Sequence, residues 1–484
     1  MKKETLDQIK RRFGNRATDS PFERVLYSRD MAPVPTLLVK PLFNTVPDLI
    51  VRPVDADEIA QILKWASADH IPVTPRAAAS TVYFNAVPVR GGIVMDLNLI
   101  KGVVGLDASA MKVTVKAGTA WRELDEYLNP LGYATQSYPS SAPAATIGGW
   151  FSMMGYGIGS LKYGSLLSQV RALEVVLPDG EIRRLTRDTE PPLDWFAASE
   201  GTLGVITRLE LEIRKLNPLI HFLIAFPDAG KMCRTLETVI QSPLLPYNVH
   251  FADDRHALAM RSLGFSPADT VPAYTLGVDY EGDPEELRRA RDTMASVVGD
   301  DPAIRLLPEE AAEREWTEKF NALRLKRSGP SVLGSEIWLP MVALSDYLSD
   351  VHKMAGRYGL DLISYGHGVA PDRATVMTMF RTDETRTLGY VLDLSLVKKI
   401  HDVGSRHGGC PYGVGLWNTP YAGRIFTPEQ RSEMKRRKQI LDRRGIMNPG
   451  KVYRAPFILN PFHFAMGMEL LAAVRRIAGR GGRK

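Results

Sequence analysis

Loops built almost entirely of small residues constrain most strongly what this chain can fold around. They cover residues 74–81, 138–157 and 199–207, and each lies beside a predicted strand or helix. Small side chains let the backbone approach a ligand closely, and consecutive N–H groups in such a loop can bind an anion. Hydroxyl groups and Arg76 in the first loop would add to that attraction. A tight β-turn is the alternative for the first loop, but the second is too long and too poor in charge for an ordinary turn. The set of three predicts a cradle for a small molecule.

The motifs of the common nucleotide and metal sites do not occur in the sequence. It contains no GxxxxGK(S/T), no GxGxxG and no HExxH, and its nine histidines include no HxH pair. Cys233 and Cys410 are too few for a disulfide scaffold, a Cys-rich zinc site or an internal iron–sulfur cluster. Any iron–sulfur centre that receives electrons from this chain would therefore belong to a partner.

Composition indicates a globular protein with a sizeable core. The 484 residues are 44% hydrophobic and 24% charged, and at about 100–200 residues per domain they allow two to four domains. The net charge of +6 is too small to favour nucleic acid as a partner. The N-terminus lacks the apolar segment of a secretory signal, and no run of about 18 apolar residues occurs, so we expect a cytoplasmic protein.

Hydrophobic periodicity predicts an α+β fold for the first block, residues 1–218. The alternation of Val113, Val115 and Ala117 with polar residues is typical of a half-buried strand. Asp55, with Glu58 three residues later, predicts the start of a helix. Further strands are expected at 48–53, 71–74, 92–97, 170–177, 181–185 and 204–213, with a helix at 121–128 and a hairpin turn at 178–180.

Strands and helices alternate in the second block, residues 219–407, which predicts a sheet with helices on one face. The expected strands are 221–226, 274–279, 335–340 and 375–380, and the expected helices are 231–241, 284–298, 308–323, 344–358 and 387–407. Residues 408–453 form a third piece of the chain.

The tail, residues 454–484, is apolar first and basic afterwards. Its apolar part includes Phe462, Phe464, Met466, Met468, Leu470 and Leu471, and its basic part includes Arg475, Arg476, Arg480, Arg483 and Lys484. Such a segment can lie peripherally in a membrane interface or dock on another subunit. The alternative is a C-terminal helix packed on its own domain.

Motifs along the whole chain come in the order found in one family. They are Val51-Arg52-Pro53, the Pro75-Arg76 loop, residues 113–118, Thr146-Ile147-Gly148-Gly149, Pro178-Asp179-Gly180, residues 199–204 and the closing Gly445-Ile446-Met447-Asn448-Pro449-Gly450-Lys451-Val452. In this order the chain resembles the FAD-linked oxidases that have the vanillyl-alcohol-oxidase (PCMH-type) FAD-binding domain. The resemblance covers about residues 20–453 and is strongest to the glycolate oxidase and D-lactate dehydrogenase branch.

The resemblance implies two α+β subdomains that hold FAD, formed by residues 1–218 and 408–453, and a cap domain, 219–407, with an antiparallel sheet covered by helices. The pyrophosphate would lie on Pro75, Arg76, Ala77, Ala78, Ala79, Ser80 and Thr81. The flavin ring would be lined by Pro139, Ser140, Thr146, Gly148, Gly149, Met153, Gly155 and Gly157, and by Glu200, Gly201, Gly204, Val205 and Ile206.

The pyrophosphate loop departs from the family at Ala77 and Ala79, where glycine is usual. Alanine resists a positive φ by about 1–2 kcal/mol, so we expect both residues to have negative φ. The loop contains no histidine, so the common covalent histidyl–flavin link is not expected and FAD should be dissociable.

The cap departs further from the hydroxy-acid branch. Of its Gly-His-x-Gly-Asp-Gly-Asn-x-His motif only Gly366, His367 and Gly368 remain, and Pro411 and Tyr412 stand where the branch has Glu and its catalytic His. With these ligands missing, a divalent metal is not expected.

Three side chains are candidates to replace the missing catalytic groups. His367 could accept a proton, Tyr412 could orient a substrate hydroxyl, and Arg324 could bind a substrate carboxylate. Lys326, Arg327 and Arg381 are further candidates for the carboxylate. The structural alternatives are a satisfied histidine at a strand end, a tyrosine ring packed against the flavin, and a solvated basic face.

The function implied by the resemblance is that of an FAD-dependent oxidoreductase. It would oxidise a small hydroxylated substrate, a 2-hydroxy acid, by hydride transfer to flavin N5, and pass electrons to an iron–sulfur protein, a cytochrome or a quinone. One alternative is a non-catalytic subunit that relays electrons through FAD. Another is a flavin-dependent transferase without net redox, whose branch has a histidine run in the cap that this sequence lacks.

Overall fold

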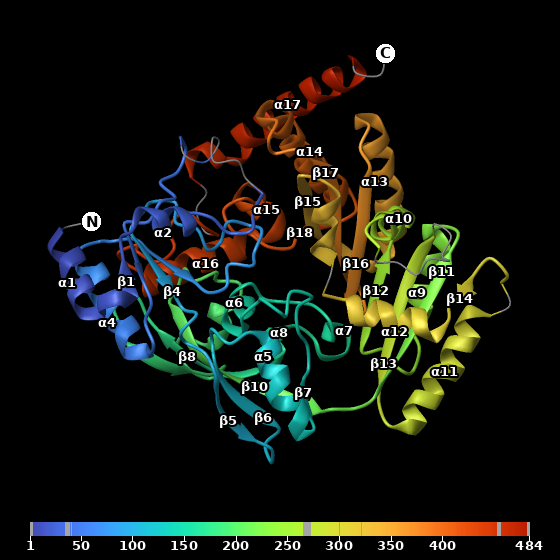
Figure 1. The fold of residues 1–484 in the computed structure, drawn as a ribbon, viewed down its shortest axis with the longest axis horizontal. Helices are drawn as coiled ribbons and strands as arrows, with labels where there is room; N and C mark the ends of the chain where they lie inside the picture. The colour runs from blue at the N-terminus through green and yellow to red at the C-terminus, as the bar shows by residue number, and fades with distance from the viewer. Residues whose placement is uncertain are drawn as a thin grey trace. The chain divides into compact units, whose positions relative to one another are not determined.

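The chain folds into two compact units (Figure 1). Unit 1 consists of Met1–Gly155, Ser165–Leu216 and Gly413–Pro461, and unit 2 of Tyr156–Gly164, Asn217–Tyr412 and Phe462–Lys484. The computed structural model describes residues 3–33, 39, 41–264, 273–299, 301–320, 322–452 and 456–481. Both units are assembled from segments that are distant in sequence.

Unit 1 contains a four-stranded sheet in the order β1-β2-β4-β3. Its strands are β1 (Ala17–Thr18), β2 (Leu49–Val51), β4 (Ile93–Asp96) and β3 (Val73–Arg76). Because β2 and β3 run parallel to β4, the carboxyl ends of these three strands lie at the same edge of the sheet. Helices α1 (Lys3–Phe13) and α4 (Ala56–Ala68) share its core. The predicted cap of α4 is confirmed, since the Asp55 carboxylate accepts the N–H of Glu58 at 2.8 Å.

The other sheet of unit 1 is six-stranded and antiparallel. Its order is β5 (Val103–Asp107), β6 (Lys112–Lys116), β10 (Val205–Lys215), β8 (Val170–Val176) and β9 (Ile182–Leu185), with β7 (Tyr133–Thr135) paired to β10. The predicted alternation in β6 is confirmed by the burial of Val113 and Val115, and the predicted hairpin joins β8 to β9. Further helices of unit 1 in the described residues include α2 (Pro21–Leu26), α5 (Trp121–Leu128), α6 (Ile147–Ser152), α8 (Leu166–Gln169), α15 (Ala422–Ile425) and α16 (Pro428–Leu441).

Unit 2 is built on one eight-stranded antiparallel sheet. Its order is β14 (Arg305–Leu306), β11 (Leu219–Phe226), β13 (Tyr274–Glu281), β12 (Asn248–Ala252), β16 (Leu362–Ala370), β17 (Arg373–Thr382), β15 (Ser331–Pro340) and β18 (Cys410–Pro411). The sequence predicted β11, β13, β15 and β17, whereas β12 and β16, which lie between them in the sheet, were not predicted.

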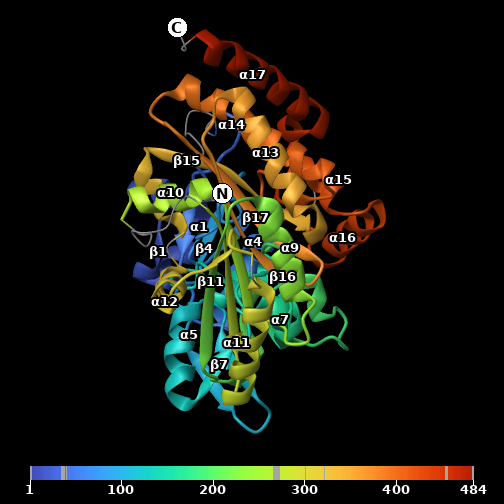
Figure 2. The same cartoon turned by 90° about the vertical axis from the view of Figure 1, so that its right-hand side faces the viewer.

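Helices cover both faces of this sheet. On one face α9 (Ala229–Ile240), α11 (Pro284–Val298), α13 (Leu344–Tyr358) and α14 (Thr387–Arg406) share the main core with buried strand residues such as Val249 and Val376. On the other face α12 (Glu309–Glu318) packs on Leu223, and α10 (Asp254–Ser262) packs near Ile363 and Met379 (Figure 2). The prediction of helices on one face only was wrong, because these strands also carry apolar residues on the second face.

Candidate flavin site and the polar sheet face

The three small-residue loops meet in unit 1. A Cβ atom on Gly201, in the third loop, would lie 3.2 Å from Cγ of Pro75 in the first. The second and third loops are joined where the N–H of Glu200 donates to the Ser152 carbonyl at 3.0 Å. Segments far apart in sequence therefore lie side by side, as a ligand cradle requires.

The backbone of the first loop fits an anion such as the FAD pyrophosphate. Within the part of the chain that the structure describes, none of the N–H groups from Ala77 to Val82 donates to a protein acceptor. Ala77 has a negative φ, as predicted, but Ala79 has φ 52°, so the prediction for Ala79 was wrong. A left-handed residue is one half of the backbone pattern that forms an anion-binding nest. The fold around the loop stabilises a conformation that alanine disfavours.

The Arg76 side chain connects the start of this loop to neighbouring segments. Its Nη1 donates to the carbonyls of Arg29 and Ala86 at 2.7 and 3.1 Å. Its guanidinium lies over the Tyr27 ring, 5.1 Å from the ring centre. These contacts use Nη1 and fix the end of β3.

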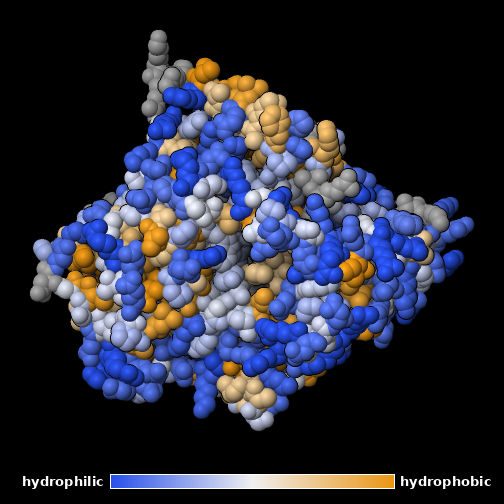
Figure 3. All heavy atoms as spheres, turned by 180° about the vertical axis from the view of Figure 1, so that it is seen from behind, coloured by the Kyte–Doolittle hydropathy of each residue, from blue (hydrophilic) through white to orange (hydrophobic). Residues whose placement is uncertain are grey.

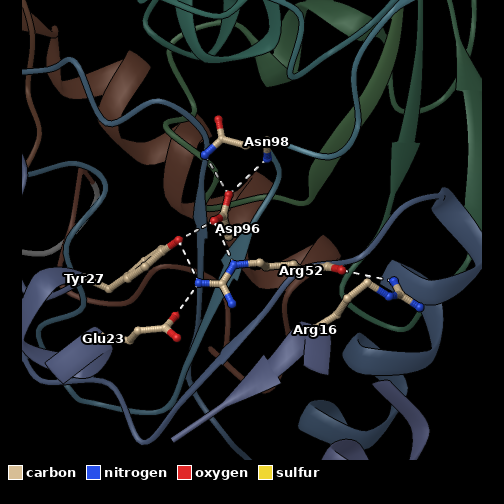
Figure 4. A network of polar contacts seen from close by, with 6 residues as sticks. All are labelled: Arg16, Glu23, Tyr27, Arg52, Asp96 and Asn98. Atoms are coloured by element: carbon tan, nitrogen blue, oxygen red, sulfur yellow. Dashed lines mark hydrogen bonds and ion pairs between the residues drawn. The ribbon is translucent and has the colours of Figure 1, made fainter. Parts of the chain in front are cut away.

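A charged network fixes the strand ends that carry the first loop (Figure 4). Arg52, just after β2, donates to Glu23 and lies 3.5 Å from the carboxylate of Asp96 at the end of β4. Tyr27 also donates to Asp96, whose second oxygen accepts the backbone and side-chain N–H groups of Asn98 at 3.0 and 2.8 Å. The network thereby holds β2 and β4 at the edge of the sheet from which the loop leaves β3.

The glycines of the second and third loops are required by protein packing. A Cβ on Gly148 would lie 2.6 Å from the Ala117 Cβ, and one on Gly155 would lie 2.1 Å from the Trp150 ring. Thr146 caps α6 by accepting the N–H of Gly149 at 3.3 Å. Among the other predicted ring-lining residues, Pro139, Gly204, Val205 and Ile206 are buried and Ser140 and Met153 are half-buried. Gly157 differs from the rest because it belongs to unit 2, where its N–H donates to Ser160 Oγ at 2.9 Å.

A buried polar cluster, formed by Asn85, Glu200, Asn448 and Lys451, ties these loops to the closing motif. The Asn448 amide donates to the carbonyls of Glu200 and Asn85 at 2.8 and 3.0 Å. Lys451 Nζ donates to the carbonyls of Asn85 and Val87 at 3.0 and 2.6 Å.

The Glu200 carboxylate is bound by backbone rather than by a cation. It accepts the N–H groups of Val414 and Gly415 at 3.2 and 2.9 Å. Burial nevertheless raises the pKa of Glu200 to about 7 and lowers the pKa of Lys451 to about 8. Burial also raises the pKa of nearby Asp30 to about 6, and its Oδ2 has no partner in the described part of the chain. Sequence reasoning missed Asp30 and Asn85, whereas Asn448 and Lys451 lie in a motif it had marked.

Unit 2 carries a row of polar side chains across four neighbouring strands. Asp279 on β13 accepts from His221 Nδ1 on β11 and from Asn248 Nδ2 on β12, both at 2.7 Å. His250, also on β12, has its Nδ1 3.9 Å from Asp279 and faces His367 on β16, with ring centres 6.2 Å apart. By strand alternation this row lies on the sheet face opposite the main core.

His367 lies inside this row rather than at a strand end. Its Nδ1 is buried and has no hydrogen-bond partner among the described residues. Burial, reinforced by His250, lowers the pKa of His367 to about 3. The ring is therefore neutral at physiological pH. It can hydrogen-bond a substrate group, but it holds a proton only weakly.

Tyr412 is held by the segment 156–164, the part of unit 2 that continues the second loop. Its hydroxyl accepts the N–H of Tyr156 at 2.9 Å. Its ring stacks on Trp338 at 5.8 Å, and Tyr156 contacts the same indole edge-on at 4.4 Å. Sequence reasoning did not single out Tyr156 or Trp338, because only the folded sheet brings them beside Tyr412.

The predicted carboxylate-binding residues have mixed surroundings. Arg324 is half-buried in the short helix η4 (Ala322–Ser328). Burial raises the pKa of Glu318, and the positive charge of Arg324 partly offsets that rise. Arg381 donates to Asp361 at 2.9 Å in an exposed pair. Lys326 is half-buried and Arg327 is exposed. In the described residues, no group of three or more His, Cys, Asp or Glu side chains is placed to hold a metal ion.

Comparison with known proteins identifies the family. Residues 47–186 match the FAD binding domain and residues 221–452 match the C-terminal domain of FAD linked oxidases. The glycolate oxidase subunit GlcD of Bacillus subtilis is 25% identical over 447 residues, covering 90% of this chain and 93% of that protein. A mitochondrial D-lactate dehydrogenase (cytochrome) of Arabidopsis thaliana is 26% identical over 426 residues, covering 84% and 73%.

Solved structures share the fold at low sequence identity. p-Cresol methylhydroxylase with substrate bound has a TM-score of 0.80 at 16% identity, covering 93% of this chain and 96% of that one. An alkyldihydroxyacetonephosphate synthase has a TM-score of 0.75 at 19% identity, covering 93% and 86%. The predicted resemblance, fold class and cofactor are thereby confirmed. The chain belongs to the FAD-linked oxidases and is an FAD-binding oxidoreductase.

Proposed function

We propose that this protein is a dehydrogenase that oxidises a small 2-hydroxy acid and passes the electrons to a separate acceptor. The support is its similarity to a glycolate oxidase subunit and a D-lactate dehydrogenase over most of the chain. The observation that carries the proposal is the unpartnered Nδ1 of the buried, neutral His367. A buried ring nitrogen without a partner is costly in a folded protein, so it is a candidate contact for a substrate hydroxyl.

The flavin supplies the electron acceptor for the C–H bond, and the chain supplies binding and orientation. In unit 1 the N–H groups of residues 77–82 would bind the pyrophosphate. In unit 2 His367 would accept the hydrogen bond of the substrate hydroxyl, and Tyr412, fixed by the Tyr156 N–H, would orient the substrate. Arg324 would bind its carboxylate. Because residues 74–81 contain no histidine, FAD is dissociable; acid precipitation should leave the yellow colour in the supernatant.

Anaerobic addition of glycolate, D-lactate and L-lactate to the purified flavoprotein tests the activity directly. Bleaching of the flavin absorbance by one of them, with no other protein present, is the expected result. Absence of bleaching by every 2-hydroxy acid would contradict the proposal.

A relay subunit without its own substrate is a second candidate function, and the low pKa of His367 favours it, because such a ring is a weak base. It predicts no bleaching by any hydroxy acid but rapid reoxidation, by an iron–sulfur protein, a cytochrome or a quinone, of flavin reduced with dithionite. A flavin-dependent transferase would instead form product from its two substrates with no net change in flavin absorbance.

A further inference from the structure

The last helix of unit 2 has a solvent-exposed apolar face. In α17 (Pro461–Gly481), five large apolar residues are spaced by four, four, four and three positions, which places them on one side of a helix. They are Phe462, Met466, Leu470, Val474 and Ile477, with exposed fractions of 71%, 58%, 67%, 45% and 73%. We call these five residues the tail face.

The opposite side of α17 is anchored to α14. Glu469 accepts from Lys398 at 2.7 Å and also pairs with Lys399, and Arg475 donates to Asp393 at 2.6 Å. Ala472 is fully buried at this contact. These polar contacts and the buried alanine orient the helix within unit 2, so the exposure of the tail face follows from how α17 is attached.

We propose that the tail face lies on an anionic lipid surface. A helix with Phe, Met and Leu on one side and basic residues beside them binds at the boundary between headgroups and acyl chains. Beyond Glu469 the sequence carries no acidic residue, and besides Arg475, which is paired with Asp393, it carries Arg476, Arg480, Arg483 and Lys484. Figure 3 shows hydrophobic residues gathered along the top of the molecule, where α17 lies.

Charge favours lipid over a second copy of this chain. Two copies packed through their tail faces would need acidic groups to pair with these basic ends, and Glu469, the acid in this stretch, is already bound by Lys398 and Lys399. Lipid headgroup phosphates supply that negative charge directly beside the acyl chains that would bury the tail face. The binding is peripheral, since no helix among the described residues is long and apolar enough to span a membrane.

Flotation of the full-length holoprotein with vesicles tests the proposal without using its activity. We expect the protein to float with vesicles of phosphatidylcholine and phosphatidylglycerol and not with phosphatidylcholine alone, and the binding to weaken as salt is raised. Leu470→Asp should lower the bound fraction at least about tenfold, because it replaces a side chain that would be buried in lipid by a charge. Leu388→Asp is the matched control: Leu388 is 75% exposed on α14, outside the tail face, and should bind like wild type.

Flavin absorbance and circular dichroism of each variant check that it has folded. Failure of the wild-type protein to float with anionic vesicles would overturn the proposal. Equal loss of binding in Leu470→Asp and Leu388→Asp would also overturn it. A third contrary result is a concentration-dependent dimer in solution that Leu470→Asp dissociates while vesicle binding is absent, since the tail face would then be an interface between two copies of the chain.

Discussion

The Glu200 and Lys451 side chains of unit 1 and the polar row of unit 2 differ in how completely their buried polar atoms are hydrogen-bonded. In unit 1 Lys451 has two backbone carbonyl acceptors, and Glu200 has two backbone donors. In unit 2 His367 Nδ1 and His256 Nε2 have no partner in the described part of the chain. An unpaired buried polar group costs about 1–3 kcal/mol. The ammonium and carboxylate groups of the unit 1 cluster are therefore satisfied by the protein, although Asp30 Oδ2 beside them is not, whereas the row of unit 2 leaves the His367 ring nitrogen available to a ligand.

The largest expected effect is on the rate of flavin reduction, and it concerns His367 in unit 2. His367→Leu should lower the rate of anaerobic flavin reduction by about 100-fold, because the substrate hydroxyl loses its hydrogen-bond acceptor. Stopped-flow absorbance measures that rate, and the FAD content should not change. Since the pKa of His367 is about 3, the wild-type rate should show no ionisation of this ring between pH 5 and 8.

His70→Asn is the control for this substitution. His70 is exposed in unit 1 at φ 54°, a conformation that asparagine tolerates, so the rate should stay at the wild-type value. An unchanged rate in His367→Leu would remove His367 from the reaction and favour the relay function.

A second prediction concerns the saturated cluster of unit 1. Lys451→Met should reduce the free energy of unfolding by about 3 kcal/mol and lower FAD content, because the Asn85 and Val87 carbonyls lose their buried donor. Urea denaturation and the ratio of flavin to protein absorbance measure the two effects. Lys435→Met, at an exposed position of α16, should change stability by less than about 0.5 kcal/mol. Equal effects of the two substitutions would show that the cluster does not hold the loops.

The third prediction concerns pH. The pKa of Glu200 is about 7 in the folded protein, above its ordinary value of 4.5. The folded state therefore binds more protons than the unfolded state between these values, and the contribution of Glu200 to stability is present below pH 4.5 and is lost as pH rises to about 7. The loss amounts to at most about 3 kcal/mol.

Urea denaturation at pH 5 and pH 7.5 measures this contribution. Glu200→Gln cannot ionise, so its stability should fall less than that of wild type between the two pH values. Asp30, with a pKa of about 6, should cause a smaller loss of stability with rising pH, and this loss should occur in both proteins. Identical pH dependence in wild type and Glu200→Gln would show that Glu200 stays ionised in the folded protein.

The smallest effect compares two alanines of the same loop. Ala79→Gly relieves a left-handed backbone at φ 52° and should stabilise the protein by up to about 1 kcal/mol. Ala77→Gly, at a residue with negative φ, should destabilise it by about 0.5–1 kcal/mol through backbone entropy. Thermal unfolding of the FAD-free proteins measures both, and effects of the same sign would contradict the conformation of the loop.

The three small-residue loops could be recognised in the sequence because their signal is local. Runs of glycine, alanine and serine after periodic strands are visible without knowing what they contact, and Asp55 marks its helix by spacing alone. The φ of Ala79 could not be predicted from the sequence. Alanine by itself prefers a negative φ, and the surrounding fold holds Ala79 at 52° instead.

The polar row of unit 2 could not be predicted, because it exists only in the strand order. His221, Asn248, Asp279 and His367 come from four strands whose neighbours are set by pairing, and two of those strands, β12 and β16, were not recognised. Gly366 and Gly368 in β16 weaken its strand signal. The low pKa of His367 could not be predicted either, because it results from burial by residues that are distant in sequence.

One bridge in unit 1 has a consequence for biosynthesis. The N–H of Val73 donates to the Ile446 carbonyl and the N–H of Asn448 donates to the Val73 carbonyl, both at 2.8 Å. The strand that releases the first loop is thus braced by residues translated more than 370 positions later. A nascent chain still on the ribosome lacks this brace until its closing motif has emerged. Capture of the vitamin-derived cofactor should therefore be a late event, and chains that terminate early should accumulate without it.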